Sequence, residues 1–303
     1  MTKYKIIVDA AADIPEEARK RYGIEVLPIP VTLGDRTVQS GTEISATEFY
    51  KLMEAYNGIP VTSQITPYAF EELFTRELEA GTQELLLFLI NSKGSATYNN
   101  AVVTRERFLA GHEGAEQKMR IHLFDGASYT GGYGYAAILA AQKLEMGVEV
   151  DDVLPLVEQQ LKRQRIYFGL YSLKYAGKSG RIPSAAVFVG EALGIKPIMQ
   201  VWDHAITTVG KARGEKKLIR EIVKMVEDDM EPNTPYSLVY GCEEVDRDEI
   251  CEELTKKIGY PPVYSFQIGP AVAINAGPRV VGAIFEVSRK KLGKESKKQE
   301  KNG

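Results

Sequence analysis

The sequence predicts an α/β protein with a doubly wound, mostly parallel sheet in its N-terminal half and an α+β C-terminal half. Short apolar runs at residues 3–8, 85–90 and 121–124 have the length and composition of buried strands. A polar loop and a segment of helical character follow each run, and this alternation is typical of parallel strands joined by right-handed crossovers. Beyond residue 161, hairpins join many of the predicted strands, which favours a mixed or antiparallel sheet.

The first strand ends at Asp9, and a helix is predicted between Asp13 and a stop at Gly23. A second strand candidate at 25–31 contains two prolines and is therefore expected at a sheet edge. The other elements expected in this half are a short hairpin arm at 37–41 and helices at 45–56, 68–79, 102–110, 135–145 and 153–163.

The C-terminal half is expected to begin with an aromatic strand at 167–175. An apolar helix at 187–194 and a hairpin formed by 195–201 and 206–209 are expected next. A basic helix at 211–226, a strand at 236–240 and a helix at 246–258 are expected to follow. The half is expected to end with a strand at 263–268, a loop beginning at Gly269-Pro270 and a last strand at 280–287. These elements predict an α/β domain at residues 1–160, an α+β domain at 161–288 and a basic, disordered tail at 289–303.

Composition and charge exclude several classes of protein. The chain has 303 residues, of which 44% are hydrophobic, and no apolar run approaches the ~20 residues that a membrane helix needs. The net charge is −3, and residues 289–303 alone contribute +5, which leaves −8 for the body. An acidic body argues against nucleic-acid binding. Cys242 and Cys251 are too few for a disulfide framework, the three histidines lack metal-ligand spacing, and no signal peptide is evident, so we expect a cytoplasmic protein without metal or cofactor.

The loop after the strand at 85–90 is the first candidate ligand site. Hydroxyl and amide side chains crowd residues 91–100, including Ser92, Ser95 and Thr97, directly before a predicted helix. In an open α/β sheet, ligands bind at the carboxyl ends of strands, and a helix N-terminus favours a carboxylate or phosphate. The alternative is that Ser95 or Thr97 only caps the helix.

A second polar loop has the same position relative to a helix. Thr62, Ser63 and Gln64 lie between two prolines, just ahead of the helix predicted at 68–79. Capping would explain one of these residues but does not require three in a row. With Arg181 as a possible further contact, the two loops predict an anionic small molecule held by hydroxyls and N–H groups between the two domains, without a strong nucleophile, base or metal.

Common catalytic motifs do not account for the site. No G-x-S-x-G sequence is present, so a nucleophile elbow has no support. The Gly177-Lys178-Ser179 sequence resembles the end of a phosphate-binding loop, but the glycine required five residues earlier is Ser172.

Eight stretches, in order, give the chain a resemblance to the DegV family of fatty-acid-binding proteins, the carrier subunits of bacterial fatty acid kinase. The resemblance covers residues 6–287. The stretches are IVDAAADIP at 7–15, VTSQITP at 61–67, NSKGSATY at 91–98, FDGASYTGG at 124–132, LKYAGKSGRIPSAA at 173–186, IKPIMQV at 195–201, GKARGEKK at 210–217 and IGPAVAINAGP at 268–278.

The resemblance implies a carrier with one long-chain fatty acid in a tunnel between two domains. It assigns the ligand carboxylate to Thr62, Ser63 and Ser95, and it implies a separate ATP-dependent kinase that makes acyl-phosphate for phospholipid synthesis. The family arginine of the K-x-R-x-x-K-K motif, associated with the kinase-facing surface, corresponds to Arg213. The arginine of the G-R-I sequence corresponds to Arg181, for which we expect a structural or ligand-end role.

Several positions depart from the family pattern. Asn275 stands where the family usually has histidine near the carboxylate, and Arg279 follows the proline where it usually has glycine. Ala10, Ala96 and Gly126 replace a serine, a glycine and a serine in the strand-end loops. Asn275 can still donate a hydrogen bond, but without charge. Arg279 is expected either to replace the missing cation or to block the tunnel mouth.

Burial of an acyl chain of about fifteen methylenes, at ~0.8 kcal/mol each, contributes at most about 12 kcal/mol, which suits lipid binding. The alternative function is an enzyme or sensor for another small anionic ligand in the same site, with Asp9 or Asp125 as the first candidate bases. The basic tail could make transient contact with an anionic membrane surface.

Overall fold

A computed structural model describes residues 3–182 and 194–293. The chain divides into two compact units. The first unit comprises Met1–Leu161 and Ile268–Ile274, and the second comprises Lys162–Gln267 and Asn275–Gly303. The predicted fold class is confirmed, because one unit contains a four-stranded parallel sheet and the other a mixed sheet with helices. No helix in the described ranges is both long and apolar enough to cross a membrane.

The first unit is organised around a parallel sheet of order β2-β1-β6-β7. Its strands are β1 (Tyr4–Asp9), β2 (Glu25–Leu27), β6 (Glu84–Leu89) and β7 (Arg120–Asp125). Every residue of β6 is buried, as its continuous apolar run predicts for a central strand. Because all pairs are parallel, β1, β6 and β7 place their carboxyl ends at one edge of the sheet.

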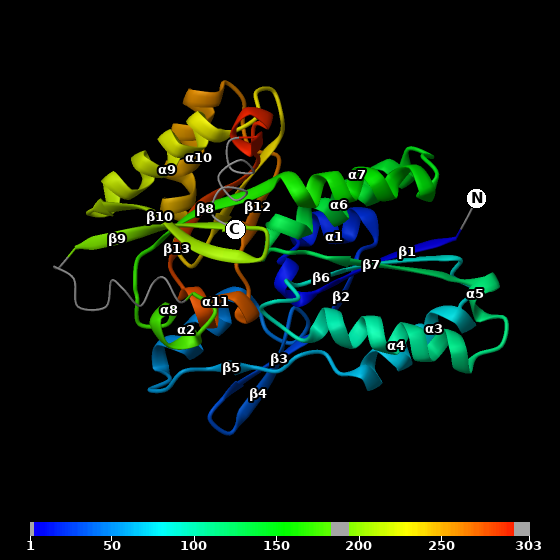
Figure 1. Cartoon of the computed structure of the whole chain (residues 1–303). Helices are drawn as coiled ribbons and strands as arrows, with labels where there is room; N and C mark the ends of the chain where they lie inside the picture. Colours follow the sequence, from blue (N-terminus) through cyan, green and yellow to red (C-terminus); the bar gives the residue numbers. More distant parts are fainter. Residues whose placement is uncertain (1–2, 183–193, 294–303) are drawn as a thin grey trace. The chain divides into compact units, whose positions relative to one another are not determined.

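Helices cover both faces of this sheet, as a doubly wound sheet requires (Figure 1). On one side lie α1 (Glu16–Tyr22), α6 (Gly131–Glu145) and α7 (Val150–Arg163), and on the other lie α3 (Pro67–Glu79) and α4 (Thr97–Gly111). A 3-10 helix, η1 (Ala10–Ala12), follows β1 directly, and α5 (Ala115–Lys118) precedes β7. The many alanines and glycines of α6 are buried, which lets this helix approach the sheet closely.

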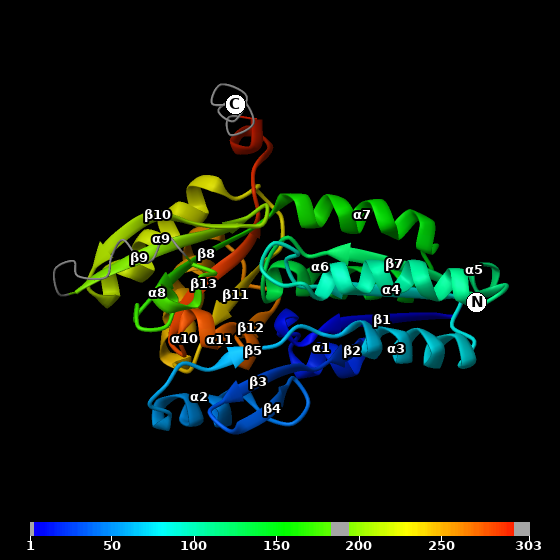
Figure 2. The same ribbon diagram turned by 60° about the horizontal axis from the view of Figure 1, so that its bottom comes forward.

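A small antiparallel sheet was only partly predicted. The strand expected at 25–31 is divided at Pro28 into β2, in the parallel sheet, and β3 (Ile29–Leu33), in a second sheet. Proline lacks the N–H group that a continuous ladder needs, so the chain leaves one sheet there and enters another. Figure 2 shows β3 with β4 (Arg36–Ser40) and β5 (Val61–Thr62), and α2 (Ala46–Ala55) lies between β4 and β5 in the chain.

The second unit contains a six-stranded sheet of order β10-β9-β8-β13-β11-β12, antiparallel except for the β11–β12 pair. Its strands are β8 (Gln164–Leu170), β9 (Ile195–Trp202), β10 (Ala205–Arg213), β11 (Tyr236–Tyr240), β12 (Ser265–Gln267) and β13 (Val280–Glu286). The helices α9 (Glu215–Asp229) and α10 (Glu244–Ile258) pack on this sheet through buried side chains such as Leu218, Ile222 and Leu254.

Three elements of this unit differ from the prediction. The strand expected at 167–175 ends at Leu170, and a short helix, α8 (Ala176–Ser179), follows. Residues 211–213 extend β10 instead of starting a helix, because they pair with β9, and the helix begins after Gly214. The loop expected at Gly269-Pro270 is a helix, α11 (Pro270–Ala276), in which proline occupies the first turn that tolerates it.

Two predicted segments reach beyond the described residues. The apolar helix expected at 187–194 falls almost entirely outside them. Of the tail that was expected to be disordered, residues 289–293 form a helical turn held by the Lys291–Asp229 ion pair at 3.0 Å and by Arg289 N–H donating to Glu231. Residues 294–303 lie outside the described part of the chain.

The central strand β13 should not tolerate a side chain at Gly282. A Cβ there would lie 2.1 Å from the Tyr167 carbonyl oxygen of the neighbouring strand β8. We expect Gly282→Ala to lower the free energy of unfolding by about 3 kcal/mol, because backbone must move to accept the methyl group. Urea unfolding measures this loss. Gly111→Ala, at a position with nothing within 4 Å, is the control and should change stability by at most about 1 kcal/mol.

Candidate ligand-binding site

The loop between β6 and α4 is a compact polar turn built on Asn91. The Asn91 carbonyl accepts from the N–H groups of Gly94 and Ser95 at 2.9 and 3.1 Å, and its side chain donates to the Tyr129 hydroxyl at 3.1 Å. A Cβ on Gly94 would lie 2.3 Å from the Tyr129 hydroxyl oxygen, so only glycine fits there without displacing the ring. The polar residues predicted around 91–100 therefore form a defined turn at the carboxyl edge of the sheet.

Ser95 is placed to donate a hydrogen bond to an anion. Its Oγ accepts from the Thr97 N–H at 3.3 Å and lies 3.0 Å from Thr97 Oγ1. Thr97 Oγ1 also accepts from the Ile65 N–H at 3.2 Å, and either hydroxyl can donate within the Ser95–Thr97 pair. When Thr97 is the donor, the Ser95 hydroxyl proton is left to donate outward. Ser95 therefore satisfies one N–H of α4, as the capping alternative expects, and still presents a donor.

Thr97 and Asn100 join the two predicted loops. Thr97 is fully buried and bonds the N–H group of Ile65, and the Asn100 amide donates to the Ile65 carbonyl at 2.8 Å. Ile65 lies two residues after Ser63, so both hydroxyl-bearing segments are fastened to the first turn of α4. Thr97, expected as a possible ligand contact, has its hydroxyl committed to this junction.

The Thr62 and Ser63 hydroxyls are free within the described part of the chain. Thr62 ends β5, where it pairs with Val31, and the Ser63 N–H donates to the Pro30 carbonyl at 3.1 Å. These backbone bonds hold the segment while neither hydroxyl bonds another described residue. Thr62 is half-buried and Ser63 is exposed. Thr62, Ser63 and Ser95 thus supply hydroxyl donors from one unit, although their contact with a ligand stays a prediction.

Asp9 stabilises the start of the loop between β6 and α4 through hydrogen bonds, a role that the sequence did not predict. Its buried carboxylate accepts from the Ile90 N–H at 2.6 Å, the Ala11 N–H at 3.0 Å and the Tyr133 hydroxyl at 2.5 Å. Burial raises the pKa of Asp9 to about 6, and the hydrogen bonds from Tyr133, Ile90 and Ala11 oppose that rise. Three donors engage this carboxylate, so it is a structural acceptor and a poor candidate for the general base considered above.

Asp125 has a comparable role at the end of β7. It accepts from the N–H groups of Ser92 and Ala127 at 3.1 and 3.0 Å. The carboxylate therefore orders the backbone of the Ser92 turn, while a ligand contact of the Ser92 hydroxyl stays a prediction. Nowhere in the described ranges do three or more His, Cys, Asp or Glu side chains gather as a metal site would require.

The remaining predicted residues belong to the second unit. Asn275 lies in the last turn of α11, Arg181 is exposed after α8, and Arg213 is exposed at the end of β10, where it pairs with Ile195. Their roles toward a ligand or a partner stay predictions.

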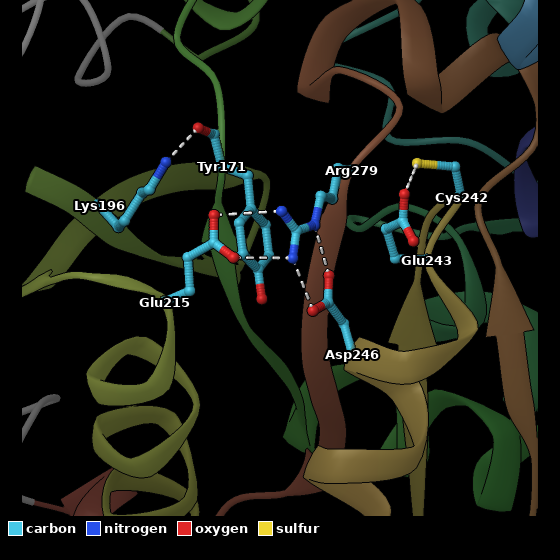
Figure 3. Close-up of polar contacts among 7 residues, drawn as sticks. All are labelled: Tyr171, Lys196, Glu215, Cys242, Glu243, Asp246 and Arg279. Atoms are coloured by element: carbon cyan, nitrogen blue, oxygen red, sulfur yellow. Dashed lines mark hydrogen bonds and ion pairs between the residues drawn. The ribbon is translucent and has the colours of Figure 1, made fainter. Parts of the chain in front are cut away.

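Arg279 is committed to a cluster of its own (Figure 3). Its guanidinium donates to both oxygens of Asp246 at 2.7 and 2.9 Å and to both oxygens of Glu215 at 3.1 and 3.0 Å. It also stacks 3.9 Å from the centroid of the Tyr171 ring, whose backbone carbonyl accepts from the Lys196 ammonium at 2.7 Å. Burial raises the pKa of Tyr171, so its phenol is neutral.

This cluster disfavours a role for Arg279 as the cation that binds a ligand. Four of its five N–H groups are used by two carboxylates, and the three charges sum to −1. The carboxylates lie in the first turns of α9 and α10, where a negative charge is favoured by the helix dipole. Arg279 therefore joins the N-termini of two helices to the start of β13.

Known proteins share this fold. A family model described as "Uncharacterised protein, DegV family" matches residues 3–288. The chain is 29% identical over 293 residues to a DegV domain-containing protein from Caldanaerobacter subterraneus, covering 94% of this chain and 99% of that protein. It is 25% identical over 283 residues to Protein DegV from Bacillus subtilis, covering 92% and 98% of the two chains. The fold is that of a two-unit α/β protein with hydroxyl-rich loops at the strand ends, and the chain belongs to the DegV family.

Solved structures share the architecture. A DegV lipid-binding protein from Thermotoga maritima superposes with a TM-score of 0.81 at 25% identity, covering 94% of this chain and 99% of that one. A fatty-acid-binding DegV family protein from Thermus thermophilus gives 0.79 at 25% identity, with coverages of 94% and 100%. A stearic-acid-binding protein from Eubacterium ventriosum, at 22% identity and a TM-score of 0.83, covers 95% of this chain and 99% of its own and shows the same fold.

Removal of the Arg279 side chain should destabilise the second unit. Arg279→Ala leaves the buried carboxylate of Asp246 without its cation, and we expect a loss of about 2 kcal/mol, less than for a fully buried pair because the arginine is one-third exposed. Urea unfolding measures the loss. Arg220→Ala removes an exposed arginine of α9 as the control and should change stability by less than about 0.5 kcal/mol. Equal effects of the two substitutions would contradict the assigned role.

Proposed function

We propose that this protein binds one long-chain fatty acid and holds its carboxylate with the hydroxyls of Thr62, Ser63 and Ser95. The observation that carries the proposal is the hydrogen-bond pattern at Ser95, which accepts from the Thr97 N–H and shares a hydroxyl–hydroxyl contact with Thr97, so that its proton can turn to an anion when Thr97 donates in that contact. The relatives from Thermotoga maritima and Thermus thermophilus, described as lipid-binding and fatty-acid-binding, support the ligand class.

The chemistry of the site suits a ligand that is held without reaction. A carboxylate loses much of its hydration on binding, and several hydroxyl or N–H donors are needed to offset that cost. The acyl chain supplies the driving force, with about fifteen methylenes contributing at most about 12 kcal/mol before ordering and association costs. Asn275 would add a neutral donor in place of the usual histidine, so this position would contribute a hydrogen bond but no positive charge to the ligand carboxylate.

We further propose that the protein is a cytoplasmic carrier and has no catalytic activity of its own. In this proposal, a separate ATP-dependent kinase phosphorylates the presented carboxylate, and the acyl-phosphate supplies phospholipid synthesis. Arg213 supports a docking role, because it is exposed at the end of β10, just before α9. Engagement of Asp9 by three donors makes the alternative of an enzyme that uses Asp9 as a base less favourable.

Mass spectrometry of an organic extract from the purified protein, made without added ligand, tests the binding function. A free fatty acid in stoichiometric amount is expected, because a ligand bound this tightly stabilises the folded protein and survives purification. An empty extract, together with no uptake of added palmitate or oleate, would contradict the proposal and would indicate that Asn275 and Arg279 accompany a different ligand class.

Ser95→Ala should weaken fatty-acid binding by about tenfold to a hundredfold, because a hydrogen bond to a charged group contributes about 1.5–3 kcal/mol. Thr97→Val should also weaken binding, since it keeps the side-chain shape but removes the group that orients Ser95. Isothermal titration with oleate measures both effects. Ser172→Ala, in the second unit, is the control. Unchanged affinity of Ser95→Ala would remove Ser95 from the site.

Arg213→Ala should leave oleate affinity unchanged and reduce acyl-phosphate formation when a fatty acid kinase and ATP are supplied. The expected loss is at least tenfold, because an exposed arginine at an interface is a common source of binding energy. Lys224→Ala, an exposed cation farther along α9, is the control. Lost oleate binding in Arg213→Ala would instead place this residue at the ligand.

A further inference from the structure

An asparagine–glycine pair, Asn57-Gly58, lies in the connection between α2 and β5 of the first unit. α2 ends at Ala55 and β5 begins at Val61, so the pair belongs to neither a helix nor a strand. The Asn57 side chain is exposed, and the Gly58 N–H group donates to no other described residue. Within the described part of the chain, neither group makes a hydrogen bond that would keep it from reacting with the other.

The residue before this pair, Tyr56, fixes the shape of the connection. Its N–H group donates to the Leu52 carbonyl at 3.0 Å, at the end of α2. Its ring lies against two glycines, because a Cβ on Gly34 would be 3.5 Å from Cε2 of the ring and a Cβ on Gly58 would be 2.5 Å from Cζ. The chain therefore folds closely over the ring at residue 58, where a residue without a side chain fits.

An asparagine followed by glycine is the pair in which a side-chain amide reacts most readily with the backbone. Glycine has no Cβ to crowd the attacking nitrogen, and a segment outside helices and strands can adopt the dihedral angles that ring closure needs. The Gly58 nitrogen forms a bond to Asn57 Cγ, and the Cγ–Nδ2 bond breaks. Nδ2 leaves as ammonia with the proton of the Gly58 N–H group, and a cyclic succinimide remains.

Water opens the succinimide at either of its two carbonyl carbons. Attack on Cγ breaks the bond from Cγ to the Gly58 nitrogen and gives aspartate. Attack on the Asn57 backbone carbonyl carbon breaks the peptide bond to Gly58 and gives isoaspartate, in which the main chain runs through Cγ. The hydroxyl of the water stays on the carbon, and its proton goes to the Gly58 nitrogen. Overall, one amide and one water become one carboxylate and one ammonium ion, without an oxidant or a cofactor.

The other described asparagines lack this combination of exposure, irregular backbone and a following glycine. Asn233 is exposed in a turn, but Thr234 follows it, and a β-branched side chain crowds the attacking nitrogen. Asn91 is buried, and its side chain donates to the Tyr129 hydroxyl. The remaining asparagines lie inside α4 or α11, where the backbone dihedral angles are fixed: Asn99, Asn100 and Asn275.

We propose that Asn57 is a site of spontaneous deamidation, and that its isoaspartate product loosens the segment that carries Thr62 and Ser63. The chemistry needs only water, the Asn57 amide and the Gly58 N–H group. The effect on ligand binding rests on the proposed fatty-acid function, whereas the modification itself does not.

The change in the main chain lies close to the proposed ligand donors. β5 is attached to β3 by two cross-strand pairs and by the Ser63 N–H bond to the Pro30 carbonyl at 3.1 Å. Isoaspartate adds one carbon to the main chain between the Tyr56 ring and this short strand, so either the packing of the ring or the pairing of β5 must adjust. The new carboxylate lies at an exposed position, where salt screens its charge.

Incubation of the full-length protein at pH 8 and 37 °C, followed by peptide mapping, tests the modification. Trypsin releases Asn57 in the peptide 52–76, where it is the only asparagine, and releases Asn302 in a separate dipeptide. We expect the peptide 52–76 to gain the mass of deamidation at a rate within about fivefold of that of the same synthetic peptide, because an exposed irregular segment reacts like free chain. A slower rate in the folded protein would overturn the proposal, because the fold would then protect Asn57.

Asn57→Gln assigns the reaction to this residue. Glutamine keeps the amide, but its longer side chain closes a larger ring and does so far more slowly. We expect the mass gain of the peptide 52–76 to disappear in this variant. Asn233→Gly removes the other exposed turn asparagine, at a φ of 60° that glycine tolerates, and should leave the rate unchanged. An undiminished mass gain in Asn57→Gln would overturn the proposal and assign the reaction to Gln64.

Isothermal titration with oleate tests the effect on the ligand segment. Asn57→Asp adds the charge without the extra main-chain carbon and should bind within about twofold of fresh protein. Deamidated protein, separated from unmodified chains by anion exchange, should bind at least about threefold more weakly because the pairing of β5 is disturbed. Aged Asn57→Gln is the control for changes elsewhere in the chain.

The outcomes separate this inference from the proposed function. A loss smaller than threefold in the deamidated protein would overturn the effect on the ligand segment, while the peptide map still decides the modification. Absence of oleate binding by the fresh protein would contradict the proposed fatty-acid function itself and would leave the deamidation of Asn57 to the peptide map.

Discussion

The Asp9 carboxylate connects three segments that meet where the first strand ends. Its donors come from η1, from the residue that follows β6 and from α6, so a single side chain joins a turn, a neighbouring strand end and a covering helix. A buried carboxylate without donors would be costly, and three donors at 2.5–3.0 Å offset that cost. The position of the β6–α4 loop, and with it Ser95, depends on this contact.

The proposed hydroxyl site also relies on uncharged hydrogen-bond donors. Thr97 contacts the Ser95 hydroxyl and accepts from the Ile65 N–H, and in the proposed site donors from these separate segments would meet one anion without a cation from the first unit. An uncharged set of donors binds a carboxylate less strongly than an arginine would, and in the proposed function the apolar chain of the ligand supplies the remaining affinity. This division suits the proposed carrier role, in which the carboxylate would be held and later presented for reaction.

In the second unit, by contrast, charged side chains pair with one another. Arg279 is neutralised by Asp246 and Glu215 and stacked on Tyr171, so it serves the packing of two helix N-termini. In contrast, the exposed cations of β10 and α9, including Arg213, have no ion pair within the described residues. These cations are exposed, as the proposed docking role of Arg213 requires, whereas Arg279 is already paired with two carboxylates.

The sequence by itself determined the alternation of buried strands and helices, the parallel sheet, the hairpin-rich second half and the two hydroxyl-bearing loops. These features follow from local periodicity and from turn chemistry, which act over a few residues. The sequence did not determine that Pro28 separates two sheets, that residues 211–213 continue a strand, or that α11 is a helix, because strand pairing and packing decided them. Only the tertiary structure showed that Asp9 accepts hydrogen bonds from Ile90 and Tyr133 and that Arg279 is already paired. Their partners lie tens to hundreds of residues away in the chain, and no local pattern encodes such contacts.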